Sequence, residues 1–209
     1  MKPPLPPPKV CLIEKHSENK SSKLILIIGV FHGEEPQGEY AIERYLREND
    51  LSKRNNTLLF IPCLNPWGKE RGIRTNSNGV DLNRNYPTKN WKLTDKDENY
   101  SGDSPGSEAE TKFMIELLDK VKPDIILTLH APLKCINFDG PTEKIAEKIA
   151  KICNYPVIED LGYPTPGSFG TYCGIERNIP TITLEYDIKE ANESIYSKSK
   201  MVFDFLSKF

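Results

Sequence analysis

The segment KLILIIGVFHGEE at residues 23–35 decides the fold predicted from this sequence. It opens with an uninterrupted run of Leu and Ile at residues 24–28, and Gly29 ends the run. A run of this length without polar alternation is typical of a strand buried on both faces of a parallel or mixed sheet. His32 and Glu35 follow it, and open α/β sheets hold their ligands beyond the carboxyl ends of strands. We therefore predict that these two side chains belong to a zinc site.

Short apolar segments alternate with amphipathic ones along the rest of the chain. Further strands are expected at residues 10–14, 57–63, 124–129, 156–159 and 181–184, and helices at residues 37–47, 107–121, 143–152 and 192–209. Residues 163–173 are expected to form a Gly/Pro loop that turns into a short helix. Strands and helices that alternate in this way predict the α/β class.

One helix start and one irregular segment carry specific signals. Ser107 and Glu110 are predicted to form a capping box, in which the hydroxyl accepts from a helix amide and the carboxylate reaches back to the cap. Before this helix, residues 65–106 show little periodicity. Long irregular segments within a domain are usually functional or disordered. The dense polar motif RGIRTNSNGVDLNRNYP at residues 71–87 favours a functional segment.

Length, charge and cysteine usage exclude several classes of protein. The 209 residues fit one domain, expected at residues 10–209 after a Pro-rich extension at residues 1–9 that lacks the apolar core of a secretory signal. A net charge of −2 gives no electrostatic reason to bind nucleic acid or an anionic membrane. No apolar run approaches the roughly 20 residues that span a bilayer. The five cysteines are irregularly spaced, which favours reduced thiols and a cytoplasmic location.

Three residues have the chemistry of a catalytic metal centre. The chain has only three histidines, and His32 and His130 each follow a predicted strand. With Glu35 they supply two imidazoles and a carboxylate, the ligand set of a catalytic zinc that keeps one position open for water. Each residue alone would more often be structural. Their combination predicts one zinc ion per chain.

Glu185 and a group of basic residues offer the remaining chemistry. Glu185 directly follows the predicted strand at residues 181–184, where a general base and a surface glutamate are equally good interpretations. The irregular segment contributes Arg71, Arg74, Asn83 and Arg84. Isolated arginines would be solvated, but beside a metal one guanidinium can stabilise an oxyanion and another can clamp a substrate carboxylate.

In order and spacing, these residues resemble the zinc carboxypeptidase family. The matching positions are His32-x-x-Glu35, Arg71-x-x-Arg74, DLNRN at residues 81–85, His130 and TLE at residues 183–185. The segments NSNGVDLNRNYPTKNW, GSEAET, HAPLKCINFDGP and GYPTPGSFGTYC are similar to the branch that cleaves γ-D-glutamyl-meso-diaminopimelate peptides. The resemblance covers most of the chain. It implies a mixed, mostly parallel central sheet flanked by helices, in a compact version.

The resemblance also implies the catalytic roles. His32, Glu35 and His130 would bind zinc. Glu185 would be the general base that later hands its proton to the leaving amine. Arg74 would polarise the scissile carbonyl and hold the oxyanion.

Substrate contacts are implied in the same way. Asn83 and Arg84 would bind the free carboxylate next to the scissile bond, and Arg71 would line the cleft in a weaker role. Tyr163 would be the tyrosine that closes over the substrate, with Tyr172 as its rival.

The implied substrate is the free murein tripeptide L-alanyl-γ-D-glutamyl-meso-diaminopimelate. Its L-centre carboxylate would take the place of a C-terminal carboxylate. Its zwitterionic D-centre needs a polar pocket, for which Asp139 and Thr171 are candidates. Ala131 follows the third metal ligand, where some relatives are expected to carry an acidic residue.

Three other functions stay open on the sequence alone. A carboxypeptidase that trims another muropeptide or an ordinary peptide would share the loop motif. A deacylase of the aspartoacylase or succinylglutamate desuccinylase type would use a related zinc site. A non-catalytic binding module would keep the pocket without the chemistry, and the complete set of key positions argues against it.

Overall fold

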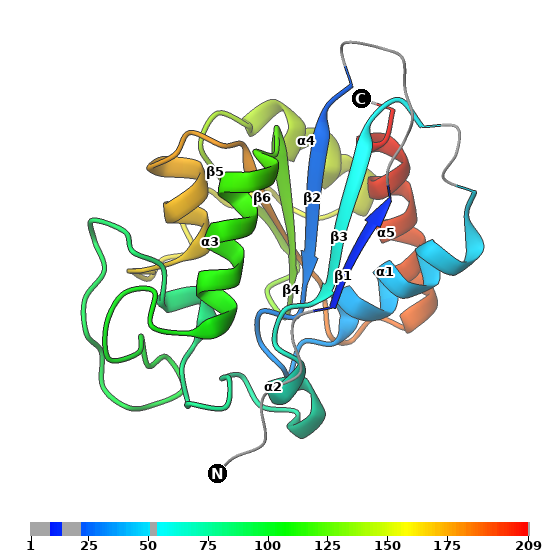
Figure 1. Cartoon of the computed structure of the whole chain (residues 1–209). Coiled ribbons are helices and arrows are strands. Elements are labelled where there is room, and N and C mark those ends of the chain that lie inside the picture. The colour runs from blue at the N-terminus through cyan, green and yellow to red at the C-terminus, as the bar shows by residue number, and fades with distance from the viewer. Residues whose placement is uncertain (1–8, 14–21, 51–53, 209) are drawn as a thin grey trace.

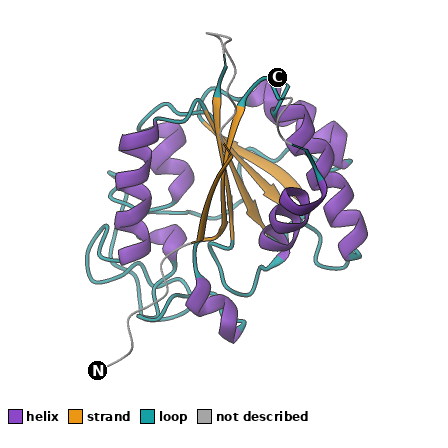
Figure 2. Cartoon of the chain, turned by 45° about the vertical axis from the view of Figure 1, so that its right-hand side comes forward, coloured by secondary structure: helices purple, strands orange, loops and turns teal. Residues whose placement is uncertain are grey.

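The computed structural model describes residues 9–13, 22–50 and 54–208, with a central sheet that carries helices on both faces (Figures 1 and 2). The strands are β1 (Lys9–Ile13), β2 (Leu24–Gly29), β3 (Thr57–Cys63), β4 (Ile125–His130), β5 (Cys135–Asp139) and β6 (Thr181–Glu185). The helices are α1 (Gln37–Glu48), α2 (Pro66–Arg71), α3 (Ala109–Val121), α4 (Glu143–Cys153) and α5 (Asn192–Leu206). A 3₁₀ turn, η1 (Leu82–Arg84), and a π-helical turn, η2 (Thr171–Ile175), lie in the connections.

The strand order of the sheet is β1-β3-β2-β4-β6-β5. The four inner strands β3, β2, β4 and β6 run parallel, and β1 and β5 join antiparallel at the two edges. This arrangement confirms the expected mixed, mostly parallel sheet. Because the inner strands are parallel, the carboxyl ends of β2, β4 and β6 lie at one edge, and the residues that follow them meet there.

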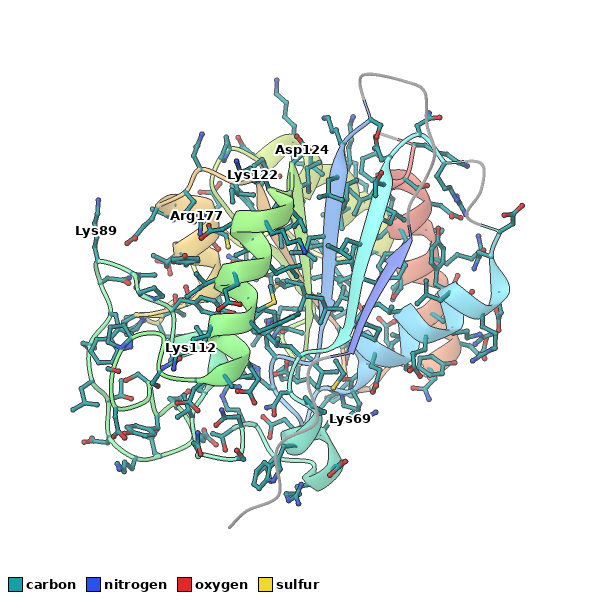
Figure 3. All side chains as sticks on the ribbon, viewed as in Figure 1. Lys69, Lys89, Lys112, Lys122, Asp124 and Arg177 are labelled. Atoms are coloured by element: carbon teal, nitrogen blue, oxygen red, sulfur yellow. The ribbon has the colours of Figure 1, made fainter. Side chains whose placement is uncertain are left out.

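The apolar run in β2 packs into two layers. Ile25 and Ile27 face a cluster with α1, α4 and α5, while Leu26 and Ile28 face a second cluster with α3 and η2. All four are fully buried, because successive side chains of a strand point to opposite faces and both faces are covered. Figure 3 shows side chains filling both layers, and the labelled Lys112 on α3 is solvent-exposed.

Two elements are missing from the sequence prediction. The start of the segment expected to be irregular instead forms α2, which Asn65 caps by accepting a hydrogen bond from the Gly68 amide at 2.9 Å. Pro66 takes the first helical position, where an amide proton is not needed. β5 (Cys135–Asp139) was also not predicted, because it alternates apolar and polar side chains and lacks the uninterrupted apolar run that marks the inner strands.

The predicted capping box at Ser107 is wrong. The residue that precedes α3 is Glu108, and no side chain caps the helix. The Ser107 hydroxyl instead donates to Glu108 Oε1 at 2.6 Å and accepts from Asn85 Nδ2 at 3.0 Å. The hydroxyl is therefore used to hold the long irregular segment against the helix start.

Other expectations have mixed outcomes. The strand expected at residues 156–159 is reduced to an isolated bridge between Ile136 and Val157. Four cysteines are free and buried: Cys63, Cys135, Cys153 and Cys173. The Cys11 side chain and residues 1–8 of the expected extension lie outside the described residues. Among the helices of the described ranges, none has both the length and the apolar character to cross a membrane.

Candidate active site

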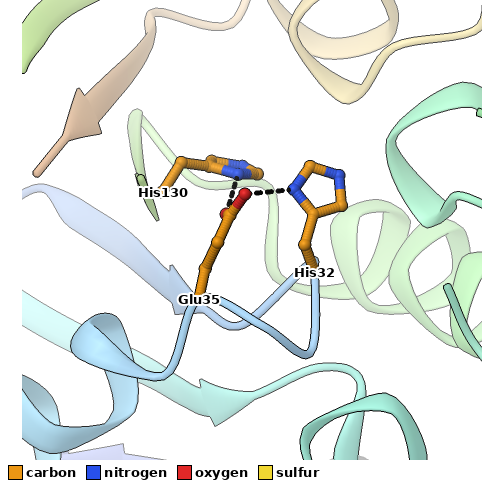
Figure 4. A group of neighbouring side chains, drawn as sticks. All are labelled: His32, Glu35 and His130. Atoms are coloured by element: carbon orange, nitrogen blue, oxygen red, sulfur yellow. Dashed lines mark hydrogen bonds and ion pairs between the residues drawn. The ribbon is translucent and has the colours of Figure 1, made fainter. Parts of the chain in front are cut away.

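His32, Glu35 and His130 converge at the carboxyl edge of the sheet (Figure 4). Nδ1 of His32 lies 2.8 Å from Glu35 Oε1, and Nδ1 of His130 lies 2.9 Å from Glu35 Oε2. All three residues are buried, with exposed fractions of 3%, 5% and 4%. The structure thus brings together the three predicted metal ligands from two neighbouring strands.

The loop between β2 and α1 is held in place by close backbone packing. A Cβ at Gly33 would lie 2.0 Å from the carbonyl carbon of Gly68 in α2, so only glycine allows this approach. Asn65 Nδ2 donates to the carbonyl oxygens of Phe31 at 3.3 Å and Arg74 at 3.2 Å. The helix α2, which the sequence did not predict, therefore supports the loop between β2 and α1.

Asp81 has no role in the sequence prediction, although it lies in the DLNRN motif. Its Oδ1 lies 3.1 Å from His32 Nε2, and its Oδ2 accepts from Arg74 Nε at 3.0 Å and Nη2 at 2.9 Å. Burial opposes ionisation of this carboxyl, but the charges of His32 and Arg74 hold its pKa below the ordinary range. Asp81 therefore orients the His32 ring so that Nδ1 faces Glu35.

The donor set fits a divalent metal such as zinc. The ligand atoms of His32, Glu35 and His130 lie within 4.8 Å of one another. Burial raises the pKa of the Glu35 carboxyl, but the charges of the two histidines outweigh it and lower that pKa to about 2. Burial lowers the pKa of His32, whereas the charges of Asp81 and Glu35 raise it to about 9. The charges that favour a proton on this imidazole also favour a metal cation beside it.

Glu185 ends β6 directly beside the third ligand. In the strand register it is opposite His130, and its Oε2 accepts from the Leu133 amide at 3.4 Å. It is 8% exposed and lines the same cleft as the three metal-ligand candidates. Burial and the Glu35 charge raise the pKa of its carboxyl, while the His130 charge opposes them. A carboxylate so placed can accept a proton near the metal centre.

The cleft has a volume of about 130 Å³ and a mostly polar lining. Besides the metal-ligand candidates and Glu185, its lining includes Arg74, Asn83, Arg84, Thr128, Ala131, Leu133, Asn137, Asp139, Tyr163, Thr165, Ser168, Phe169, Gly170 and Thr183. The long irregular segment, β4, β5, β6 and the loop before η2 all contribute. Asn83 Oδ1 accepts from the Phe169 amide at 2.9 Å, and Arg84 Nη1 donates to the Asn83 carbonyl at 2.7 Å.

Arg71 is separated from the other predicted site residues. Its guanidinium lies 4.1 Å from the centre of the Trp67 ring and donates to the Trp67 carbonyl at 3.0 Å. The side chain is 46% exposed and does not line the cleft. The expected position of Arg71 in the cleft therefore does not match its observed position.

The two candidate tyrosines also differ in position. Tyr163 lines the cleft and is 48% exposed. Tyr172 packs against Tyr86 with ring centres 5.4 Å apart, and its hydroxyl accepts from Arg177 at 2.7 Å. Of these two tyrosines, only Tyr163 lines the cleft. Thr171 is likewise not among the cleft residues, whereas Asp139 is.

Comparisons with known proteins agree with this geometry. Residues 7–146 match the sequence model of the family described as zinc carboxypeptidase, Peptidase_M14. Murein peptide amidase A of Escherichia coli K12 is 34% identical over 181 residues, which cover 81% of this chain and 73% of that protein. The crystal structure of the murein-tripeptide amidase of Escherichia coli O157 matches with a TM-score of 0.78 and 32% identity, over 91% of this chain and 83% of the other. Thrombin activatable fibrinolysis inhibitor has a similar fold, with a TM-score of 0.76 at 18% identity over 95% of this chain and 64% of the other. The chain therefore belongs to the zinc carboxypeptidase family.

Proposed function

We propose that the protein hydrolyses the γ-D-glutamyl–meso-diaminopimelate amide bond of the free murein tripeptide in a zinc-dependent reaction. The observation that carries the proposal is one polar cleft lined by His32, Glu35, His130, Glu185 and two arginines, in a chain 34% identical to murein peptide amidase A. An apolar cleft would instead favour an aromatic or aliphatic leaving residue.

The metal would be held by His32, Glu35 and His130, with Asp81 orienting the first of them. A zinc ion bound there would supply a water with a pKa of about 7 and would polarise a carbonyl oxygen. The ligand assignment is supported by the convergence of two Nδ1 atoms on one carboxylate.

Glu185 and Arg74 would perform the proton transfer and the charge stabilisation. Glu185 accepts the proton of the attacking water and later delivers it to the leaving nitrogen. Arg74 lies on the cleft wall with its Nη1 3.9 Å from Glu35 Oε1, close enough to the metal ligands to face the developing oxyanion. Its contact with Asp81 fixes the guanidinium before substrate arrives.

Arg84 and Asn83 would bind the L-centre carboxylate of diaminopimelate. Arg84 is 7% exposed and lines the cleft, so a carboxylate beside it would be bound by a guanidinium that is largely shielded from water. This carboxylate lies next to the scissile bond, as a C-terminal carboxylate does. Tyr163 would cover the occupied cleft from its exposed rim.

Product analysis tests this function directly. The purified protein with zinc is incubated with L-alanyl-γ-D-glutamyl-meso-diaminopimelate and, separately, with the α-linked isomer, and the products are identified by mass spectrometry. We expect free diaminopimelate from the γ-linked peptide only. Release from both isomers would favour the second candidate, a carboxypeptidase, because Arg84 can bind the carboxylate of either. Release from neither would contradict both functions.

We further propose that residues 10–209 form one catalytic domain and that it works in the cytoplasm. The two apolar clusters pack on opposite faces of one sheet, and the four cysteines with described side chains are free thiols. Limited proteolysis that left two stable fragments, or recovery of the native protein outside the cytoplasmic fraction, would contradict these proposals.

A further inference from the structure

A second pocket, with a volume of about 480 Å³, adjoins the catalytic cleft at Arg74. The loop between β2 and α1 contributes Glu34 to its wall, and the long irregular segment contributes residues 72–75, 78–79, 96–98 and 100. Of the described residues that line the cleft, Arg74 alone also lines this pocket. The pocket is therefore a space next to the reacting groups to which the proposed chemistry assigns nothing.

The Arg74 guanidinium connects the two spaces. Its Nη1 lies 3.9 Å from Glu35 Oε1 in the metal site and 3.9 Å from Glu34 Oε1 in the pocket. In the proposed function the scissile carbonyl lies between the metal and Arg74, and the leaving residue lies beside Arg84. The rest of the peptide continues from that carbonyl on the opposite side, and there it meets Glu34.

The acyl part of the murein tripeptide is long enough to reach this carboxylate. It is L-alanyl-D-glutamate, whose α-amine lies roughly 9 Å from the scissile carbonyl carbon when the chain is extended. Because one guanidinium would contact the carbonyl oxygen and also lies close to Glu34, the distance to be spanned is shorter than this chain. The amine can therefore reach Glu34 without strain.

Glu34 has a carboxylate that a ligand can approach. Its side chain is 48% exposed, and its distance to Arg74 is too long for a hydrogen bond. The nearby Asp97 is used within its own loop, where its Oδ1 accepts from the Asn99 amide at 2.7 Å. Within the described part of the chain, Glu34 is thus the carboxylate of this pocket that lies beside the reacting groups.

Backbone hydrogen bonds hold the walls of the pocket in place. The Asp81 amide donates to the Tyr100 carbonyl at 2.8 Å, which ties the far wall to the residue that orients His32. The Gly33 amide donates to the Arg74 carbonyl at 3.3 Å, which ties the near wall to the loop that carries Glu34. The pocket is therefore formed before a peptide binds, as ligand sites usually are.

We propose that this pocket holds the acyl part of the substrate and that Glu34 binds its α-ammonium group, so that the protein selects peptides with a free amino terminus. This inference rests on the proposed function for the direction in which the peptide lies. An ammonium group forms charge-assisted hydrogen bonds with a carboxylate, whereas an acylated amine has lost the charge that makes them strong.

The experiment compares three forms of L-alanyl-γ-D-glutamyl-meso-diaminopimelate, with a free, an N,N-dimethylated or an N-acetylated amino terminus. The dimethyl form keeps the positive charge and adds a bulk similar to that of the acetyl group. For the zinc-loaded protein, kcat/KM for the two charged peptides should exceed that for the acetylated one by about 10-fold, because Glu34 is half-exposed. Equal values for the dimethylated and acetylated peptides would overturn the inference.

Two glutamine variants separate recognition from a general effect on the site. Glu34→Gln should remove the preference for charged peptides and keep one equivalent of zinc. Glu70→Gln removes the same charge from the exposed surface of α2, where Glu70 pairs with Arg71 at 3.3 Å, and should keep the preference. An unchanged preference in Glu34→Gln, or its loss in both variants, would overturn the inference.

The parent protein decides if Glu34→Gln fails to bind zinc. Its preference for the dimethylated over the acetylated peptide should shrink as the salt concentration rises from about 0.01 M to about 1 M, because a half-exposed charge is screened. A preference that does not change with salt would overturn the inference.

A binding measurement distinguishes this inference from the proposed function. If the parent cleaves no γ-linked peptide, the proposed function fails. L-alanyl-D-glutamate and its N-acetyl form are then titrated into the zinc-loaded parent and into Glu34→Gln by calorimetry. Tighter binding of the free dipeptide by the parent alone would support the pocket on its own. The same ratio of affinities in both proteins would overturn it.

Discussion

Asp81 contacts three groups of the active site at once. Its Oδ1 contacts the His32 ring and also accepts from the Asn83 amide at 2.7 Å. Its Oδ2 accepts from the Arg74 guanidinium. A single buried carboxylate therefore contacts the proposed metal ligand His32, the proposed oxyanion donor Arg74 and the turn proposed to bind the substrate carboxylate. The sequence alone could not assign this role, because Asp81 is separated from His32 by 49 positions. The DLNRN motif does not show which side chain Asp81 contacts.

Asp81→Asn is expected to weaken zinc binding by about 10–100-fold, because an amide cannot balance the His32 and Arg74 charges. Competition with a zinc-binding dye measures the affinity. Asp139→Asn serves as the control, since it removes a cleft carboxylate that does not touch a ligand. Parental zinc affinity in Asp81→Asn would contradict the positioning role.

Glu185→Gln is expected to keep one equivalent of zinc and to lose about 10²–10⁴-fold in kcat, because the amide cannot accept the proton of the attacking water. Turnover of the murein tripeptide and the metal content of the same sample are the two measurements. A variant that turns over at the parental rate would exclude Glu185 as the base. Loss of the metal would instead indicate that Glu185 supports the ligand set.

Arg84→Ala and Arg71→Ala form a matched pair of charge deletions. Arg84 is buried in the cleft, so its loss should weaken binding of the substrate carboxylate by roughly 2–5 kcal/mol. Arg71 stacks on Trp67 outside the cleft, and its loss should leave kcat/KM nearly unchanged. Steady-state kinetics on both variants tests this, and comparable losses would restore a substrate role to Arg71.

At the scale of elements, the buried strands were the most predictable part. β2, β3, β4 and β6 follow from short runs of apolar residues, because a strand covered on both faces has no polar alternation. β5 and α2 could not be predicted with the same means. Asn65-Pro66 is both a strand end and a helix start, and only the packing of Gly33 against Gly68 shows which element follows.

The contact between the long irregular segment and α3 is another feature that the sequence did not show. Asn76 Nδ2 donates to Glu108 Oε2 at 2.8 Å and to Glu110 Oε2 at 3.2 Å. Asn78 Nδ2 adds a bond to Glu108 Oε2 at 2.7 Å. The carboxylates of Glu108 and Glu110 therefore accept hydrogen bonds from the long irregular segment. The capping box predicted for Ser107 and Glu110 does not form.

Glu110→Gln is expected to change the pH dependence of stability. Burial raises the pKa of the Glu110 carboxyl in the folded state, and the Glu108 charge adds to this. The folded protein therefore holds this proton more tightly than the unfolded chain, and stability falls as pH rises from the ordinary carboxyl value through the raised pKa. The glutamine variant lacks this loss.

Urea unfolding between pH 4 and pH 7 measures the effect. The free energy of unfolding of Glu110→Gln, relative to the parent, should increase with pH across this window. Glu116→Gln on the exposed side of α3 is the control and should follow the parent at each pH. A Glu110→Gln curve parallel to that of the parent would contradict the prediction.

At the scale of the whole molecule, the site is predictable where strand ends supply it. His32, His130 and Glu185 each follow or end a buried parallel strand, and parallel strands share one edge. Arg71 could not be placed correctly, because its spacing to Arg74 does not show that the end of α2 turns it outward. Side-chain direction in an irregular segment depends on contacts that only the folded chain provides.

Zinc is expected to stabilise the fold, because its ligands join the β2–α1 loop to the end of β4. A ligand present at 100 times its dissociation constant adds about 2.7 kcal/mol to the free energy of unfolding, or roughly 5–10 °C in Tm for a chain of this size. A chelator should remove this shift and added zinc should restore it, as measured by thermal unfolding. His32→Ala should show no shift, and an equal shift in this variant would place the ion elsewhere.

The segment that carries Tyr163 is attached at both ends. Ile158 donates its amide proton to Ile136 at 2.9 Å, and the Gly167 carbonyl accepts from the Tyr86 amide at 2.9 Å. Tyr163 thus lies in a loop that is held at both ends, and the length of this loop limits how far the ring could move over the cleft. Doubling the length of this loop would add only about 0.6 kcal/mol to the entropic cost of closing it between the two anchors, whereas shortening it would strain the anchoring hydrogen bonds. The loop therefore tolerates insertion far better than deletion, and its length is itself a determinant of how Tyr163 reaches a bound peptide.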